Sequence, residues 1–235
     1  MRALIPILLL FTLTACRGLS ITEDDQRAMD AVAQLFDGSY EFTKGYTSQY
    51  GIGPDAGTVS YFTVTLSNSK AMENNYDFRG VYASRMAYEV YAQLGEGRHD
   101  YSQIFVEIKL ANGETPKWSY SIEELAEVME LQSVIDTVTE LIKHQDYEGL
   151  SEQFLSEPDP APTIEQIRAV CAPADSSYGK VEQTEFLGFV FHQAEGDYRS
   201  YAYLLGTMER EEEDTALTLI VNRFDQKLAG LNFSY

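Results

Sequence analysis

The chain has 235 residues, and 37 acidic against 17 basic side chains give it a formal net charge of −20. This charge argues against binding to nucleic acid, where affinity comes largely from Lys and Arg on phosphates, and against electrostatic adsorption to anionic lipid. We interpret it as a solvated acidic surface, with a specific basic partner as the alternative. Hydrophobic residues make up 44%, which is enough for one or two hydrophobic cores.

The first residues have the layout of a secretory signal. One positive charge, at Arg2, precedes an apolar run from Ala3 to Leu13, and small residues follow it. The run is about half of the ~20 residues that a membrane-spanning helix needs, so a permanent transmembrane anchor is not expected here.

The signal ends in Leu13-Thr14-Ala15-Cys16, which resembles the lipobox of bacterial lipoproteins. The resemblance implies a signal peptide over residues 1–15, diacylglycerol and palmitate-type acyl chains on Cys16, and a tether over residues 16–22. Two or more acyl chains anchor a protein stably. In this family an Asp after the cysteine commonly retains the protein at the inner membrane, so Arg17 favours the outer membrane, facing the periplasm, in a cell with two membranes. An ordinary signal with a chance cysteine is the alternative.

The region 23–120 reads as one helix followed by antiparallel strands. A stripe that includes Ala28, Val32 and Phe36 predicts a helix over Glu23–Phe36. Alternating or Tyr- and Val-rich runs predict strands over Thr58–Leu66, Met86–Leu94 and Ile104–Leu110. Residues 67–85 and 95–101 read as polar connections, and residues 115–120 break the pattern.

The region 121–235 opens with helices and continues with strands. Capping boxes at Ser121–Glu124 and Thr163–Gln166 predict the starts of two helices. The first runs to about His144, a short helix follows over Tyr147–Leu155, and a connector with Pro158, Pro160 and Pro162 leads to the second, which ends at Cys171. Strands are predicted over Val181–His192, Tyr198–Met208, Ala216–Val221 and Leu228–Phe233, with turns at Glu195–Asp197 and Glu211–Asp214.

Both regions therefore predict the α+β class, as two domains over 23–120 and 121–235. The second resembles NTF2-like domains of the cystatin-like superfamily, through the helix end Leu141–Leu150, the strand entry Tyr178-Gly179-Lys180-Val181 and the closing segment Lys227–Phe233. The resemblance implies a sheet curled around its helices with a conical pocket, a fold that hosts isomerases, dehydratases and pure binding modules. The first region is cystatin-like in its expected shape. Fold alone does not assign the function.

An enzyme of this kind needs ionisable groups that converge in the pocket. Tyr178, Glu185, His192 and Tyr203 lie in or near the predicted sheet and are the candidate pocket residues, although their spacing does not force a shared site. His99, His144 and His192 are the only histidines, and no pair has the spacing of metal ligands. Glycine-rich phosphate loops and nucleophile motifs are missing, so neither a metal ion nor a cofactor is expected.

Two residue types, cysteine and tyrosine, are each open to a packing role or a functional role. If Cys16 carries lipid, Cys171 has no partner in the chain, and it is either a small buried side chain or a reactive thiol. Ten of the 16 tyrosines lie in the first region, and we single out six of these, which either pack the sheet or present a binding surface for sugars or proteins. They are Tyr46, Tyr50, Tyr76, Tyr82, Tyr88 and Tyr91.

The leading hypothesis is a membrane-anchored envelope lipoprotein that binds a protein or a small ligand without catalysis. The first alternative is a small-pocket enzyme of the NTF2-like type, related to isomerases and dehydratases. The second alternative is a structural subunit of an envelope complex.

Overall fold

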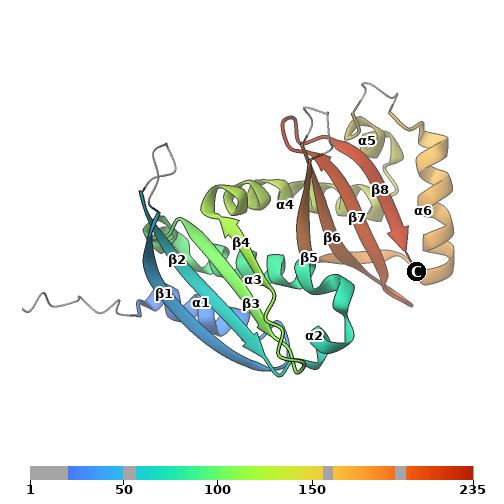
Figure 1. The fold of residues 1–235 in the computed structure, drawn as a ribbon. Coiled ribbons are helices and arrows are strands. Elements are labelled where there is room, and N and C mark those ends of the chain that lie inside the picture. Colours follow the sequence, from blue (N-terminus) through green and yellow to red (C-terminus); the bar gives the residue numbers. More distant parts are fainter. Residues whose placement is uncertain (1–20, 50–56, 156–160, 194–199, 235) are drawn as a thin grey trace, which may run out of the picture.

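The computed structural model describes residues 21–49, 57–155, 161–193 and 200–234, and it shows an α+β protein with two four-stranded sheets (Figure 1). The first part contains α1 (Glu23–Val32), β1 (Ser39–Gln49), β2 (Gly57–Ser67), α2 (Lys70–Asn74), η1 (Tyr76–Phe78), α3 (Arg79–Leu94), η2 (Gly95–Asp100), β3 (Gln103–Lys109) and β4 (Lys117–Ser121). The second part contains α4 (Ile122–Lys143), α5 (Tyr147–Glu152), α6 (Ile164–Tyr178), β5 (Val181–Gln193), β6 (Ser200–Arg210), β7 (Thr215–Asn222) and β8 (Leu228–Ser234).

Several sequence predictions lie outside the described residues. They are the signal segment, the lipidation site Cys16 with Arg17, Tyr50, the prolines at 158 and 160, and the turn at 195–197. Within the described part of the chain, no helix is long and apolar enough to cross a membrane.

The first sheet has the strand order β1-β2-β3-β4. β1 pairs with β2, and β3 pairs with β4, in the antiparallel sense, whereas β2 and β3 are parallel and α3 makes the connection between them. On the face toward α1 and α3, Phe62, Val64 and Leu66 pair with Ile104, Val106 and Ile108, and all six are buried. The expectation that every strand in this region is antiparallel is therefore wrong, because a helix crosses between two of them.

The predicted strand over Met86–Leu94 is wrong, because these residues form the second half of α3. The buried residues Ala83, Met86, Ala87, Val90 and Leu94 recur every three or four positions, which is the period of a helix face. Tyr and Val have a high strand propensity, but tertiary packing of the helix face overrides it. Residues 67–85 hold α2 and the start of α3 rather than a connection alone, and residues 115–120 contribute to β4.

The second part begins without a linker, since Ser121 ends β4 and also caps α4. Its hydroxyl accepts a hydrogen bond from the backbone N–H of Glu124 at 3.1 Å, and its own N–H donates to the Glu124 carboxylate at 2.8 Å. The predicted capping box is thus confirmed, and the one at Thr163–Gln166 is confirmed as well. Helix α1 ends at Val32, earlier than predicted.

Helix α6 continues through Pro173 to Tyr178, so the predicted end at Cys171 is wrong. Proline removes one backbone hydrogen bond of a helix. Tertiary contacts hold the last turns in place: Ala174 is fully buried, and Asp175 accepts a hydrogen bond from the guanidinium of Arg210 at 2.8 Å.

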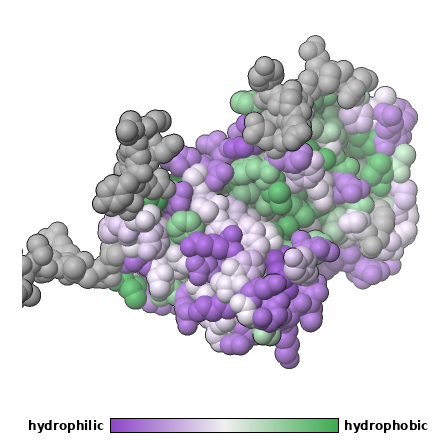
Figure 2. All heavy atoms as spheres, viewed as in Figure 1, coloured by the Kyte–Doolittle hydropathy of each residue, from purple (hydrophilic) through white to green (hydrophobic). Residues whose placement is uncertain are grey.

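The second sheet is an antiparallel meander in the order β5-β6-β7-β8, packed on one side against α4, α5 and α6 (Figure 1). The inward row Phe189, Leu204 and Leu219 is buried. The opposite face carries Val190, Tyr203 and Ile220 in one cross-strand row, and hydrophobic residues gather over this part of the molecule (Figure 2).

Helix α3 packs against both sheets, so the two parts share one continuous hydrophobic core. On the side toward β5, the hydroxyl of Ser84 accepts a hydrogen bond from the buried backbone N–H of Phe189 at 2.7 Å. Gly188 makes this approach possible: a Cβ at that position would lie 2.3 Å from the carbonyl oxygen of Val81, and its φ of +147° favours glycine. The ring of Tyr88 meets that of Phe186 edge-on at 5.2 Å.

Candidate functional site

The four residues proposed from the sequence as pocket candidates do not share a pocket. His192 and Tyr203 lie side by side on the outward face of the second sheet, with ring centroids 5.9 Å apart and nearly perpendicular. Glu185 pairs with Thr207, four residues along β6 from Tyr203, which places it about 13 Å from that tyrosine. Both Glu185 and His192 are exposed.

Tyr178 lies at the end of α6, away from the other three candidates, and its carbonyl oxygen accepts backbone hydrogen bonds from the acidic turn after β6. The structure thus brings together His192 and Tyr203 only. Among the described residues, no group of three or more His, Cys, Asp and Glu is arranged to hold a metal ion.

Cys171 is a fully buried free thiol in α6. Burial, with a smaller contribution from the negative charge of Asp175, raises its pKa to about 11. A thiolate is the reactive form of cysteine, so the environment of Cys171 suppresses its reactivity.

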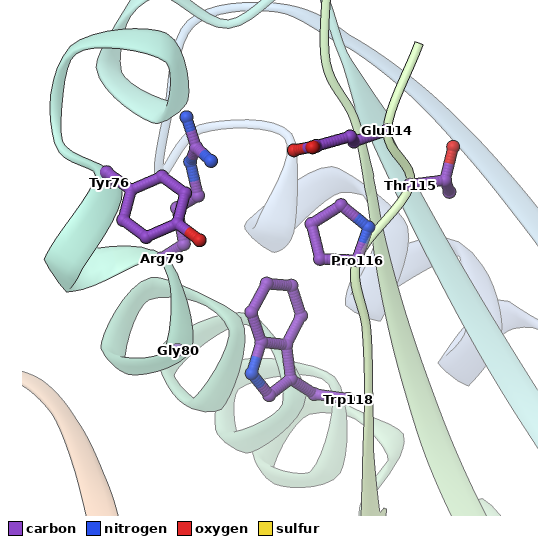
Figure 3. Close-up of a pocket in the computed structure, with 7 residues that line it drawn as sticks. All are labelled: Tyr76, Arg79, Gly80, Glu114, Thr115, Pro116 and Trp118. Carbon is purple, nitrogen blue, oxygen red and sulfur yellow. The ribbon is translucent and has the colours of Figure 1, made fainter. Parts of the chain in front are cut away.

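A cavity of about 500 Å³ lies in the first part of the molecule, where the start of α3 faces the turn between β3 and β4 (Figure 3). Pockets for small ligands commonly have volumes of ~300–1,000 Å³. The lining residues come from η1, from the first turn of α3 and from the segment that enters β4: Tyr76, Arg79, Gly80, Glu114, Thr115, Pro116 and Trp118. Two other hollows lie on the surface. One is lined by the last turns of α4 and the residues that follow it, and the other by α6 alone.

Arg79 is the most buried charged group of this cavity, with 7% of the residue exposed. Its Nε donates a hydrogen bond to the carbonyl oxygen of Met72 at 2.6 Å, which ties it to the end of α2. Its guanidinium carbon lies 4.6 Å from the ring centroid of Tyr76, a cation–π contact. Two contacts thus fix the orientation of the guanidinium.

The two Nη atoms of Arg79 remain open to solvent. Neither Nη atom has a hydrogen-bond partner in the described part of the chain. In that part, the one fully buried side-chain atom without a hydrogen-bond partner is Nη2 of Arg210, so the Nη atoms of Arg79 are not fully buried. A guanidinium carries five N–H donors, and burying them without partners is costly. The cavity is therefore where these donors meet water or a ligand.

Trp118 forms the opposite wall. It lies on the inward face of β4, paired with Val106, and packs against the core at the sheet edge. Gly80 leaves room for the indole, because a Cβ there would lie 3.4 Å from its Nε1. The hydroxyl of Tyr120 donates to the carbonyl oxygen of Gly80 at 3.3 Å and holds β4 against the start of α3.

Glu114 completes the rim. The turn that carries it is fixed by a hydrogen bond from the N–H of Leu110 to the Glu114 carbonyl at 2.9 Å, and by one from the N–H of Ala111 to the Glu73 carboxylate at 2.7 Å. The Glu114 side chain points into the cavity, toward the side of Arg79 (Figure 3). Among the described residues, no ion pair within 4.0 Å joins the two.

The sequence reasoning named Tyr76 but missed Arg79, Glu114 and Trp118. Two signals could have drawn attention to them: the chain has a single tryptophan, placed two residues after a proline, and Tyr76 precedes Arg79 by three positions. The segments that build the cavity are about 35–40 residues apart, and only the fold brings them together.

Comparison of the chain with models of protein families, with curated proteins and with solved structures finds no match.

Proposed function

We propose that the protein is a lipid-anchored envelope protein that binds a small ligand, without catalysis, in the cavity at the start of α3. One observation carries this proposal: a nearly buried guanidinium, that of Arg79, keeps its Nη donors free in a cavity walled by Tyr76 and Trp118. Oriented polar groups among aromatic walls are what a binding site for a small molecule requires.

The enzyme alternative rests on a weaker arrangement. Acid–base catalysis needs a base and a donor within reach of the same substrate atom. Glu185, Tyr178 and the pair of His192 with Tyr203 lie in three separate places. Within the cavity at α3, Arg79 and Glu114 offer hydrogen-bonding groups that suit binding and orientation of a ligand.

The single tryptophan provides a direct test of the cavity. Trp118 lines it, so its fluorescence reports occupancy without any label. We expect at least one member of a probe panel, consisting of neutral disaccharides, succinate and the dipeptide Ala-Ala, to shift the emission saturably. Tyr76→Ala should weaken the affinity that the shift reports by roughly tenfold or more, whereas Tyr46→Ala, which alters a comparably exposed tyrosine on β1, should leave it unchanged. Failure of every probe, or an affinity that Tyr76→Ala leaves unchanged, overturns the proposal.

The anchor is tested separately, through the two cysteines. Cys16→Ser should abolish incorporation of labelled palmitate and release the protein from membranes, while Cys171→Ala should keep both. Unchanged fractionation of Cys16→Ser would show that the chain is not a lipoprotein. Arg17→Asp should move the protein from the outer to the inner membrane of a cell with two membranes.

We also propose that the second part is NTF2-like. Three helices, α4–α6, precede an antiparallel four-stranded sheet that packs against them, and this order supports the assignment. The cystatin-like shape proposed for the first part has less support, because β2 and β3 are parallel and enclose α3 in the chain. Superposition of an experimental structure on NTF2-like domains tests both assignments.

A role as a subunit of an envelope complex has one observation in its favour. Val190 is 46% exposed and continues into a row with Tyr203 and Ile220 on the outward face of the second sheet. Hydrophobic residues gather over this part of the molecule (Figure 2). Exposed apolar area of this kind often marks contact with another protein. If it does here, Val190→Asp should reduce the size of the complex extracted in mild detergent, and an unchanged size excludes this role for the face.

A further inference from the structure

We infer that the cavity at the start of α3 binds a neutral saccharide, through stacking on its aromatic walls and hydroxyl contacts to Arg79 and Glu114. The inference rests on the proposed function, since it names the ligand class of that site. It follows from three properties of the cavity: its charge, its walls and the geometry of its polar groups.

The charges of the site oppose one another, so they select neither an anion nor a cation. The chain carries a net charge of −20, which repels an anion from the whole surface, and Glu114 adds a negative group at the rim. Arg79 places a fixed positive charge deep in the same cavity, which repels a cation. A neutral ligand meets neither penalty.

The walls favour a ligand with apolar faces. Tyr76 is 71% exposed, and its ring stands at one side of the cavity, while the indole of Trp118 and the ring of Pro116 stand at the others (Figure 3). The C–H faces of a sugar ring can pack on such surfaces and displace water from them. The cation–π contact with Arg79 fixes one face of Tyr76 and leaves the rest of this ring for a ligand.

The polar groups favour hydroxyls. A hydroxyl both donates and accepts, so neighbouring hydroxyls on one ring can accept from the Nη atoms of Arg79 and donate to the carboxylate of Glu114. Because Nε of Arg79 is occupied by the carbonyl of Met72, the fork formed by the two Nη atoms is what faces the ligand. The hydroxyl of Thr115 adds a further group at the rim.

A zwitterion such as a dipeptide is the main competitor, because its carboxylate could meet Arg79 and its ammonium Glu114. Glu114 is exposed, however, and ion pairs in contact with solvent contribute little net affinity. Binding such a ligand would also require the carboxylate to lose its water. A saccharide forms the same two contacts and brings no charge of its own that must lose its water.

The experiment is a titration of the full chain in detergent with cellobiose, maltose and N,N′-diacetylchitobiose, with Ala-Ala and succinate as the competing classes. Trp118 emission and isothermal calorimetry are read in parallel. At least one disaccharide should bind, and Tyr76→Ala should weaken it by roughly tenfold or more, as expected for loss of an aromatic anchor. Tyr46→Ala should leave the affinity unchanged.

Glu114→Gln separates the two ligand classes, because glutamine keeps hydrogen-bonding atoms but loses the charge. A saccharide should retain its affinity within roughly threefold, whereas an ammonium-bearing ligand should weaken by more than that, because it loses its counter-charge at the rim. Binding of Ala-Ala or succinate with no binding of any disaccharide overturns the saccharide inference and leaves the ligand-binding function standing. Absence of binding by all five probes overturns both.

Discussion

Gly188→Ala is the substitution expected to damage the junction between the two sheets most. The added Cβ would lie 2.3 Å from the carbonyl oxygen of Val81 and 2.6 Å from the hydroxyl of Ser84, distances that real Cβ atoms do not adopt. The φ of +147° adds strain of about 1–3 kcal/mol for any residue with a side chain. Relief of the overlap by movement of β5 costs about 1–3 kcal/mol more.

That movement also weakens the hydrogen bond from the N–H of Phe189 to Ser84, which contributes about 1 kcal/mol. We therefore expect Gly188→Ala to lower the free energy of unfolding by about 3–7 kcal/mol, which is a large effect for one methyl group. Urea unfolding, followed by far-ultraviolet circular dichroism and by Trp118 fluorescence, measures this loss.

Gly113→Ala is the matched control. Gly113 also has a positive φ, of +88°, but a Cβ there would meet no atom within 4 Å. This variant therefore carries the backbone strain without the overlap, and it should cost about 1 kcal/mol. If Gly188→Ala costs no more than Gly113→Ala, the close approach of β5 to α3 does not stabilise the protein and the reasoning is refuted.

Three further predictions concern buried polar groups. Burial works against ionisation of Asp25, but hydrogen bonds from Lys44 and its other neighbours outweigh burial and lower the pKa of this carboxyl. The stabilisation from the ionised carboxylate is therefore complete above the ordinary pKa of 3.8, and it is lost as the pH falls through the pKa of the folded state. Asp25→Asn should flatten the pH dependence of urea unfolding below about pH 4. Cys171 should resist alkylation at neutral pH until the chain is unfolded in urea, as followed by mass spectrometry, because burial raises its pKa to about 11. Asp175→Asn should destabilise the protein by about 3–5 kcal/mol in urea, because the side chain of Arg210, fully buried, loses the carboxylate at 2.8 Å.

Each of these three has a clear contrary outcome. If Asp25→Asn shows the same pH dependence of urea unfolding as the unaltered chain, the ion pair between Asp25 and Lys44 does not stabilise the protein. Rapid alkylation of Cys171 in the folded chain would show that α6 opens readily. A loss of less than about 1 kcal/mol in Asp175→Asn, no greater than for an exposed control such as Asp136→Asn, would show that water compensates Arg210.

The parts of the fold that depend on local chemistry could be predicted from the sequence. The capping boxes of α4 and α6 involve side chains three residues apart, and both are confirmed. The alternation in β2 and β3 also gave their positions, because half-buried strands have a strict two-residue period.

The remaining parts depend on contacts that are distant in the chain. Residues 86–94 are rich in strand-forming side chains, and they become helical because α3 is packed between two sheets. The cavity was missed for the same reason: Arg79 and Glu114 become neighbours only when β3 lies parallel to β2 and its following turn meets the start of α3.

The packing of α3 on both sheets also sets an order of assembly. Ser84 and Phe189 are 105 residues apart in the chain, so this contact closes a long loop, which costs entropy before it stabilises the fold. Synthesis completes α3 and the first sheet well before β5 exists. Until β5 is synthesised, the side of α3 that contacts Phe186 and Phe189 in the complete fold is exposed to solvent. Chains that end before β5 therefore expose an apolar helix face and are prone to associate with one another.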